Sequence, residues 1–486
     1  MNEIPRRPLG GFEAAPVQPA TPRGRYRGRS GPISVLDVGS SKITCLIGRV
    51  ESDGVLRVLS VGHQRSRGVR AGSVVDLDQA EGAIRAAVAQ AEEQADLQAR
   101  ELIVNLSCGQ PESRHFNVQM PLHGQAVGDN ELRRIVAEGR ARAYAESREV
   151  VHAIPLGYTV DGTSGVRDPR GMVCETLAAR LHVVDASVAT LRNLAACFAR
   201  CDLEIESLVA APFASGLATL VEDERELGVT VVDMGAGTTS LAVFADGHLQ
   251  HTDVIPVGGH HVTNDVARGL STTIAHAERM KTLHGSTGAA PEDDRELLPV
   301  PLVGEDDHAI AKVPRSMLVG IIRPRLEETF ELVRARLEDA GLGRLAGRRV
   351  VLTGGASQLI GVRELAAHVL DKQVRLGRPP VLRGLPDSAA GPAFAGAIGL
   401  LIWAATEGQI ARDLAPVGHA GPPGPVRRLF TWLRERLQAH GALREGADTI
   451  RAATGEIILP PDQFRPDKLV PDLVCGVCQE EGVAPV

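Results

Sequence analysis

Apolar residues recur along this chain in two series of short runs that have the same order. The first series predicts three strands, a helix and a fourth strand, at 33–38, 43–50, 55–62, 78–97 and 102–107. The second series predicts the same elements in the same order, at 229–234, 240–245, 249–256, 260–269 and 349–353. The hydrophobic pattern therefore predicts an α/β fold whose two halves are duplicates.

Each half places a turn of small residues between its first two strands. The turns are residues 37–42 (DVGSSK) and 233–239 (DMGAGTT), and both begin with an aspartate at the end of an apolar strand. Small side chains let the backbone approach a ligand, and consecutive N–H groups in such a turn can bind an anion. An aspartate beside bound phosphates suits a hydrated Mg²⁺ ion. A simple β-hairpin explains one such turn, whereas two copies with matching strands favour a duplicated phosphate site.

The composition is that of a large protein with several domains. The 486 residues are 43% hydrophobic, which is enough for substantial cores in roughly two to four domains. The net charge of −7 and the 3% aromatic content argue against a general nucleic-acid binder. The seven cysteines are scattered, which is typical of reduced thiols in a cytoplasmic protein.

Two segments bear on export and membrane insertion. The first 32 residues contain six arginines with much Pro and Gly and no apolar run, so they predict a disordered basic arm and no signal peptide. The longest apolar stretch, 393–405, is shorter than the roughly 20 residues that cross a bilayer. It predicts a buried core helix.

Polar and Gly/Pro-rich segments interrupt the two halves and predict two insertions. The chain returns to the core at 350–357 (VVLTGGAS), where the Gly pair either lets a flat ring approach the backbone or forms an ordinary strand-to-helix turn. The predicted segments are a basic arm (1–32), a first lobe (33–115 and 196–227, with 386–407), a first insertion (116–195), a second lobe (228–270 and 346–385), a second insertion (271–345), a linker (408–424), a helix (425–440) and a tail (441–486).

Six short motifs together resemble those of one protein family. They lie at 37–42, 224–228, 233–238, 255–259, 277–281 and 352–356. Over about residues 33–437 the chain is similar to the FtsA family of bacterial cell-division proteins, within the actin, Hsp70 and sugar-kinase superfamily. The resemblance implies an actin-like, duplicated (RNase H-like) ATPase fold of two lobes, with an inserted subdomain and a C-terminal amphipathic helix.

The resemblance also implies a site for ATP and Mg²⁺. Asp37 and Asp233 would lie near the hydrated metal ion. The residues implied to contact the nucleotide are Gly39, Ser40, Ser41, Lys42, Gly235, Gly237, Thr238, Thr239, Glu278, Lys281, Gly354, Gly355 and Ser357. Glu278 and Lys281 share a helix face, so a surface ion pair is the alternative for them. Ala211 stands where actin-like filament proteins often carry a Glu or Gln that orients the attacking water, so weak ATP turnover is expected.

A segment that follows a Pro/Gly-rich linker has the pattern of a helix in a membrane interface. It spans 425–440 and starts with Pro, which suits a first helical turn. The residues expected to meet an anionic membrane surface are Val426, Arg427, Arg428, Leu429, Phe430, Trp432, Leu433, Arg434 and Leu437. A helix packed on the protein's own core is the alternative.

The resemblance further implies partners and a location. FtsA proteins form actin-like filaments and link filaments of the tubulin-like protein FtsZ to the cytoplasmic face of the cell membrane at the division site. Arg325 matches a basic position in the lobe that receives the FtsZ C-terminal peptide, although a lone Arg on a helix is often a solvated charge. The first insertion would contact neighbouring subunits and other division proteins.

Two other classes of protein share the expected fold. A sugar-kinase-like phosphotransferase would need a carboxylate base aimed at a substrate hydroxyl, and no obvious one accompanies the two turns. A pilus-assembly ATPase related to FtsA is closer, and the amphipathic helix argues against it. The tail adds a single CxxC at 475–478, which has too few ligands for a zinc site. The roles of the tail and of the basic arm stay open.

Overall fold

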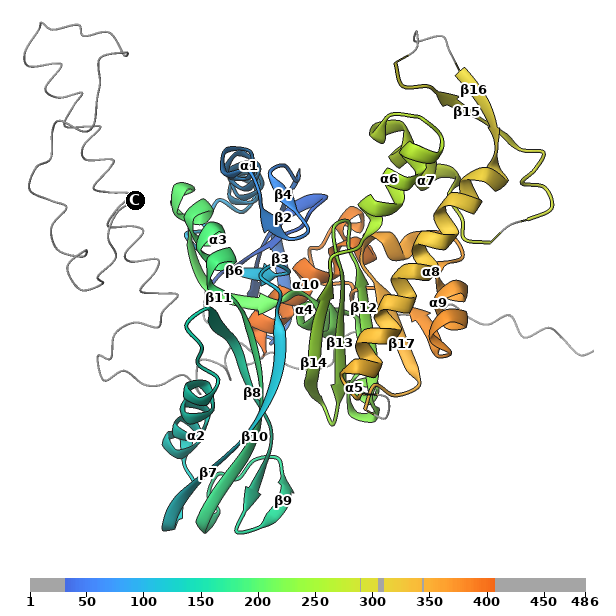
Figure 1. The fold of residues 1–486 in the computed structure, drawn as a ribbon. Helices are drawn as coiled ribbons and strands as arrows, with labels where there is room; N and C mark the ends of the chain where they lie inside the picture. The colour runs from blue at the N-terminus through green and yellow to red at the C-terminus, as the bar shows by residue number, and fades with distance from the viewer. Residues whose placement is uncertain (1–30, 289, 305–309, 343–344, 407–486) are drawn as a thin grey trace, which may run out of the picture. The chain divides into compact units, whose positions relative to one another are not determined.

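The computed structural model describes residues 31–288, 290–304, 310–342 and 345–406 (Figure 1). The predicted amphipathic helix at 425–440 and the CxxC at 475–478 lie outside these residues, as do most of the predicted arm and the linker. Within the described part of the chain, no helix is long and apolar enough to cross a membrane.

The first half of the chain forms a five-stranded mixed sheet in the order β11-β6-β1-β2-β3. Its strands are β1 (Ile33–Val38), β2 (Lys42–Val50), β3 (Leu56–Arg65), β6 (Glu101–Leu106) and β11 (Glu204–Ala210). Strand β1 pairs antiparallel with β2 and parallel with β6, so the β1–β2 turn and the C-terminal end of β6 lie at the same end of the sheet's strands. Helices α1 (Leu77–Ala95) and α3 (Val188–Arg200) pack on the sheet through a shared apolar core.

The second half repeats this sheet in the order β14-β13-β12-β17-β18. Its strands are β12 (Val229–Met234), β13 (Thr239–Ala245), β14 (His248–Ile255), β17 (Arg349–Thr353) and β18 (Gln373–Leu376). Strand β12 pairs antiparallel with β13 and parallel with β17, as β1 does with β2 and β6. Each strand therefore has a counterpart in the other sheet, which confirms the predicted duplicated α/β fold.

Helices α4 (Ala211–Thr219) and α10 (Ala395–Ala405) pack against each other in a core to which both sheets contribute. The contact is close, because a Cβ added at Gly399 would lie 1.8 Å from the carbonyl oxygen of Ala214. Only glycine fits there. The apolar residues of α10 are buried, as predicted for the stretch 393–405.

A separate four-stranded sheet is inserted between β6 and α3, in the order β7-β10-β8-β9. Its elements are β7 (Glu112–Ala126), α2 (Asp129–Arg142), β8 (Arg148–Val160), β9 (Thr163–Val166) and β10 (Val173–Ser187). Helix α2 packs on this sheet around a small core of its own. The sheet spans 112–187, whereas the predicted first insertion spans 116–195 and so includes more than half of α3, which packs on the first sheet.

Of the remaining elements, one short hairpin belongs to the first half, and the others lead into the second sheet or surround it. Long helix α8 packs against α6, α7 and α9, and its apolar residues enter the core of the second sheet. The bounds are β4 (Val69–Arg70), β5 (Ser73–Val74), α5 (Glu222–Leu227), α6 (Gly259–Gly269), α7 (Ile274–His284), β15 (Leu297–Pro301), β16 (Ile310–Pro314), α8 (Arg315–Asp339) and α9 (Val362–Leu370).

Candidate functional site

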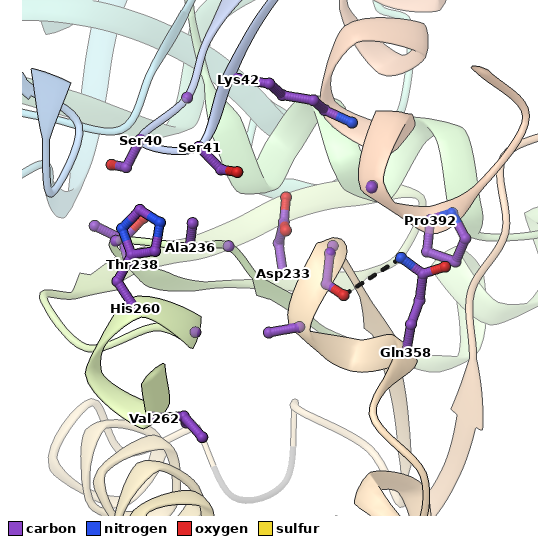
Figure 2. A pocket seen from close by; sticks show the side chains of 18 of the residues that line it. Ser40, Ser41, Lys42, Asp233, Ala236, Thr238, His260, Val262, Gln358 and Pro392 are labelled. Atoms are coloured by element: carbon purple, nitrogen blue, oxygen red, sulfur yellow. Dashed lines mark hydrogen bonds between the residues drawn. The ribbon is translucent and has the colours of Figure 1, made fainter. Parts of the chain in front are cut away.

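A cavity of about 420 Å³ lies where the two duplicated turns approach each other. Figure 2 shows Ser40 and Ser41 of the first turn on one side of it, with Ala236 and Thr238 of the second turn on the other. The predicted site residues that line the cavity are Asp37, Gly39, Ser40, Ser41, Lys42, Asp233, Gly235, Gly237, Thr238, Glu278, Lys281, Gly354 and Gly355. Segments that lie far apart in the sequence thus converge on one cavity.

The two turns have the same local geometry. The N–H of Gly39 donates to the carbonyl of Lys42 at 3.1 Å, and the N–H of Gly235 donates to the carbonyl of Thr238 at 2.9 Å. A Cβ at Gly39 or at Gly235 would lie 2.8 or 2.9 Å from that same carbonyl oxygen. Both turns therefore close too tightly for a side chain at this glycine.

Two partly buried carboxylates and one ammonium group lie in the cavity wall. Burial, followed by the charge of Asp233, raises the pKa of Asp37 to about 6, although Lys42 opposes the rise. Burial also raises the pKa of Asp233, against a hydrogen bond from Ser215 and the charge of Lys42. Burial lowers the pKa of Lys42 to about 8, and its ammonium lies 3.2 Å from the centroid of the Phe394 ring. A cation between the two acids would complete their charge balance, so the donor set fits a divalent metal.

Glu278 and Lys281 form an ion pair that reaches beyond their own helix. The Nζ of Lys281 donates to Glu278 at 2.7 Å, to the hydroxyl of Thr263 at 2.8 Å and to the carbonyl of Gly259 at 3.2 Å. Burial raises the pKa of Glu278, but the hydrogen bonds from Lys281 and Thr263 outweigh it and hold the pKa below its usual value. The pair thus joins α7 to the start of α6 at the cavity wall.

The Gly pair after β17 forms another part of the wall. Gly354 has φ +85°, and a Cβ there would lie 2.3 Å from Oδ1 of Asp233. At Gly355 the nearest neighbour of an added Cβ is Ala393 at 3.8 Å, an ordinary contact, and the residue itself is exposed. The backbone here is therefore exposed to a ligand in the cavity.

Two predicted site residues do not line the cavity. Ser357 is buried, and its hydroxyl donates to the carbonyl of Gly354 at 2.8 Å. Thr239 is buried at the start of β13, and its hydroxyl has no partner among the described residues. Arg325, which was predicted to meet a partner and not the nucleotide, lies on α8, and its guanidinium pairs with Asp265 at 2.5 Å and with Glu328.

The structure adds residues that the motifs did not indicate. Asn105, near the end of β6, accepts the N–H of Val38 through Oδ1 at 2.7 Å and lines the cavity. His260 enters the cavity from the first turn of α6, and Gln358 donates to the carbonyl of Gly355 at 3.3 Å (Figure 2). Ser215 on α4 donates from its hydroxyl to Oδ2 of Asp233. Only Asn105 had a sequence signal, because parallel strands end at a common edge.

Helix α4 presents an alanine to the cavity. Its first residue, Ala211, is in the wall, and Pro212 follows in the first turn, where the missing N–H is tolerated. The acidic residues among those that line the cavity are Asp37, Asp233 and Glu278. The beginning of α4 therefore offers no side chain that could orient a water molecule.

Comparisons with known proteins identify the family. A family model described as cell division protein FtsA matches residues 230–399, and one described as the SHS2 domain inserted in FTSA matches residues 108–185. The cell division protein FtsA of Agrobacterium fabrum is 44% identical over 423 residues, which are 84% of this chain and 95% of that relative. The chain belongs to the FtsA family.

Other FtsA relatives and one solved structure agree with this membership. FtsA of Pseudomonas aeruginosa is 33% identical, covering 84% of this chain and 98% of its own, and FtsA of Escherichia coli K12 is 32% identical, covering 83% and 97%. A structure of the PilM-PilN type IV pilus biogenesis complex has a TM-score of 0.55 at 18% identity, covering 79% and 99%, which concerns the fold alone. The predicted cell-division role and the actin-like fold with its insertion are thereby confirmed.

Proposed function

We propose that this cell-division protein binds ATP with Mg²⁺ in the cavity, and that the nucleotide-bound chain assembles into filaments that tether FtsZ to the membrane. The observation that carries the nucleotide proposal is the convergence of both turns, with Lys42 at the end of the first, on one cavity. Backbone N–H groups, hydroxyls and an ammonium are the donors that bind phosphate oxygens. Their geometry supports a polyphosphate more than a neutral ligand.

Each part of the wall has a role in this proposal. Ser40, Ser41 and Thr238 would bind the phosphates, while Glu278 and Lys281 would face the ribose. When bound, Mg²⁺ would neutralise charge between phosphates and the two aspartates. No group of three or more His, Cys, Asp or Glu residues in the described ranges could hold a metal ion. That fits an ion held mainly by phosphate oxygens and water, as Mg²⁺ usually is.

We infer that the chain binds ATP but hydrolyses it slowly. Ala211 cannot position or deprotonate a water molecule, and the acids in the wall belong to the metal position or to the pair with Lys281. Turnover is therefore expected to be well below the roughly 1–10³ per second of evolved enzymes. ATP would act mainly by fixing a conformation that assembles.

The membrane role rests on the amphipathic segment 425–440, which lies outside the described residues. Each buried Leu or Phe would contribute roughly 1.5–3 kcal/mol, and each Arg about 1 kcal/mol near an anionic surface. Ordering each helical residue costs about 1 kcal/mol or more, so a single helix should bind reversibly. Several helices on one filament would bind together through effective concentration.

For FtsZ, we propose that an acidic peptide binds at the lobe that contains Arg325. The side chain of Arg325 is 28% exposed and already pairs with Asp265 and Glu328. A peptide carboxylate would therefore have to compete with two internal partners. Replacing Arg325 with Glu is expected to weaken FtsZ binding through repulsion between like charges.

Titration calorimetry of the full chain with ATP, with and without Mg²⁺, tests the nucleotide proposal. Lys42→Met removes the ammonium whose charge acts on both aspartates and is expected to weaken ATP binding at least about tenfold. Gly82→Ala is a matched control, because Gly82 faces open space on α1. Equal ATP affinity in all three proteins would contradict this use of the cavity.

A further inference from the structure

The inserted sheet is joined covalently to the first half of the chain, through β6 and α3. Its polar contacts nevertheless reach other parts of the chain, among them the start of α4 and the edge strand β14 of the second sheet. Both contacts are made by side chains that project from strands of the inserted sheet, β8 and β7. They lie outside the residues assigned to the nucleotide.

The first contact is made by His152 on β8. Its Nε2 accepts the N–H of Ala210 at 3.0 Å. Ala210 ends β11 and immediately precedes Ala211, which opens α4 and lines the cavity. One hydrogen bond therefore links the inserted sheet to the backbone beside the cavity.

Aromatic packing fixes the same imidazole. The His152 ring is edge-on to Phe213 of α4, with centroids 5.5 Å apart and planes at 90°, and lies 6.3 Å from Trp403 of α10. Phe213 in turn lies 6.0 Å from Phe244 of the second sheet. Aromatic residues are only 3% of this chain, and Phe213, Trp403 and Phe244 pack in sequence around this imidazole and α4.

The chemistry of His152 suits a permanent acceptor. It is 6% exposed, and burial followed by the charge of Arg140 lowers its pKa to about 3. The imidazole is thus neutral near neutral pH, and because Nε2 accepts the Ala210 N–H, its single proton lies on Nδ1.

The second contact is made by Ser113 on β7. Its hydroxyl donates to the carbonyl of Thr252 at 3.0 Å and accepts the N–H of Thr252 at 2.8 Å. His182 Nε2 lies 2.9 Å from the same hydroxyl. Because the single hydroxyl proton goes to Thr252, His182 must donate through Nε2. The neutral imidazole therefore orients Ser113 toward β14.

We propose that His152 is a positioning residue for the first turn of α4, and that with Ser113 it couples the inserted sheet to the nucleotide cavity. Helix α4 also carries Ser215, which holds Asp233 at the proposed metal position. A ligand that moves the second turn must therefore move α4 or strain the His152 contact. The inference rests on the proposed function only for the identity of the ligand.

Hydrogen exchange of the full chain tests the coupling with two variants at one position. His152→Phe keeps an aromatic ring against Phe213 but offers no acceptor to Ala210, whereas His152→Gln restores an acceptor. Without nucleotide, His152→Phe is expected to speed exchange at residues 210–214 by at least about threefold, and His152→Gln to restore it. Equal exchange in the two variants would overturn the proposal.

A second arm adds ATP with Mg²⁺. The wild-type chain is expected to gain at least about threefold protection in β8 and β10, and His152→Phe to lose most of that gain while ATP affinity stays within about threefold. ATP binding without protection in the inserted sheet, or full protection in His152→Phe, would refute the coupling. Failure of the wild type to bind ATP would refute the proposed function instead, and the nucleotide-free arm would still decide the inference.

Ser113→Ala is the substitute test variant if His152→Phe does not fold. It removes both bonds to Thr252 and is expected to speed exchange at Thr252 and to reduce the ATP-induced protection of the inserted sheet. Unchanged exchange at both places would count against the coupling. A purely local packing role predicts faster exchange in β7 and β14 without any change in the response to ATP.

Discussion

Gly237→Ala is expected to weaken nucleotide binding by closing the gap between the two turns. A Cβ at this position would lie 2.4 Å from Oγ of Ser40, 2.8 Å from Cβ of Ser40 and 3.0 Å from the backbone N of Ala71. The first distance is about 1 Å inside ordinary contact, and rotating the Ser40 hydroxyl leaves the other two contacts in place. The turns must therefore move apart.

Overpacking of this kind costs about 1–3 kcal/mol. If the strain falls on the state in which both turns hold the phosphates, ATP affinity falls by roughly 5- to 150-fold, since about 1.4 kcal/mol is tenfold. The ligand-free protein can relieve the strain by separating the turns, so its melting temperature should change little.

A fluorescent ATP analogue, titrated into the wild-type chain and into Gly237→Ala, measures this effect. Gly82→Ala is the control, because an added Cβ there meets open space on a helix and is expected to stabilise the fold by about 0.5–1 kcal/mol without affecting the ligand. Wild-type affinity in Gly237→Ala would refute the view that phosphates bind between the two turns.

Three further outcomes are expected. The pKa of His152 is about 3 in the folded chain against 6.5 for an ordinary histidine. Its contribution to the free energy of unfolding is therefore complete above pH 6.5 and falls by up to ~1.4 kcal/mol per pH unit toward pH 3. In a chemical-denaturation series, His152→Phe should lose less stability than the wild type as the pH falls. Ser215→Ala removes a hydrogen bond to Asp233, so the gain in ATP affinity on adding Mg²⁺ should shrink up to about tenfold. The ATP affinity measured in EDTA should be unchanged, and an equal loss in both conditions would exclude a role at the metal. Replacing Trp432 and Leu433 with Glu should release the chain from anionic liposomes in a flotation assay, and retained binding would exclude the segment as the anchor.

The duplicated fold could be predicted because its signals are local. Each strand–turn–strand unit carries its own apolar runs and its own small residues, and the two units repeat within one sequence. The order of strands in both sheets then follows from the same pairing rules applied twice. The boundaries of the first insertion were harder to predict, because an amphipathic helix such as α3 could cover either sheet. Its packing on the first sheet depends on contacts with residues that lie far away in the sequence.

The cavity was only partly predictable from sequence. Glycines and hydroxyls in the turns could be assigned from their motif, since the turn fixes where they point. Ser357 and Thr239 belong to the same motifs, but both side chains are buried in the core. Ser357 donates there to the carbonyl of Gly354, and Thr239 is packed at the start of its strand. Ser215 comes from a helix with no motif, and tertiary packing alone brings its hydroxyl to Asp233; His260 lines the cavity one residue beyond the motif at 255–259.

Recruitment of FtsZ to anionic liposomes by the full chain, measured by cosedimentation with ATP and Mg²⁺, tests the central claim most directly. FtsZ is expected to sediment with liposomes only when the chain is present, and more strongly with nucleotide than without it. Replacing Arg325 with Glu should release FtsZ while leaving the chain on the membrane. FtsZ that stays in the supernatant while the nucleotide-bound chain sediments would contradict the proposed tether.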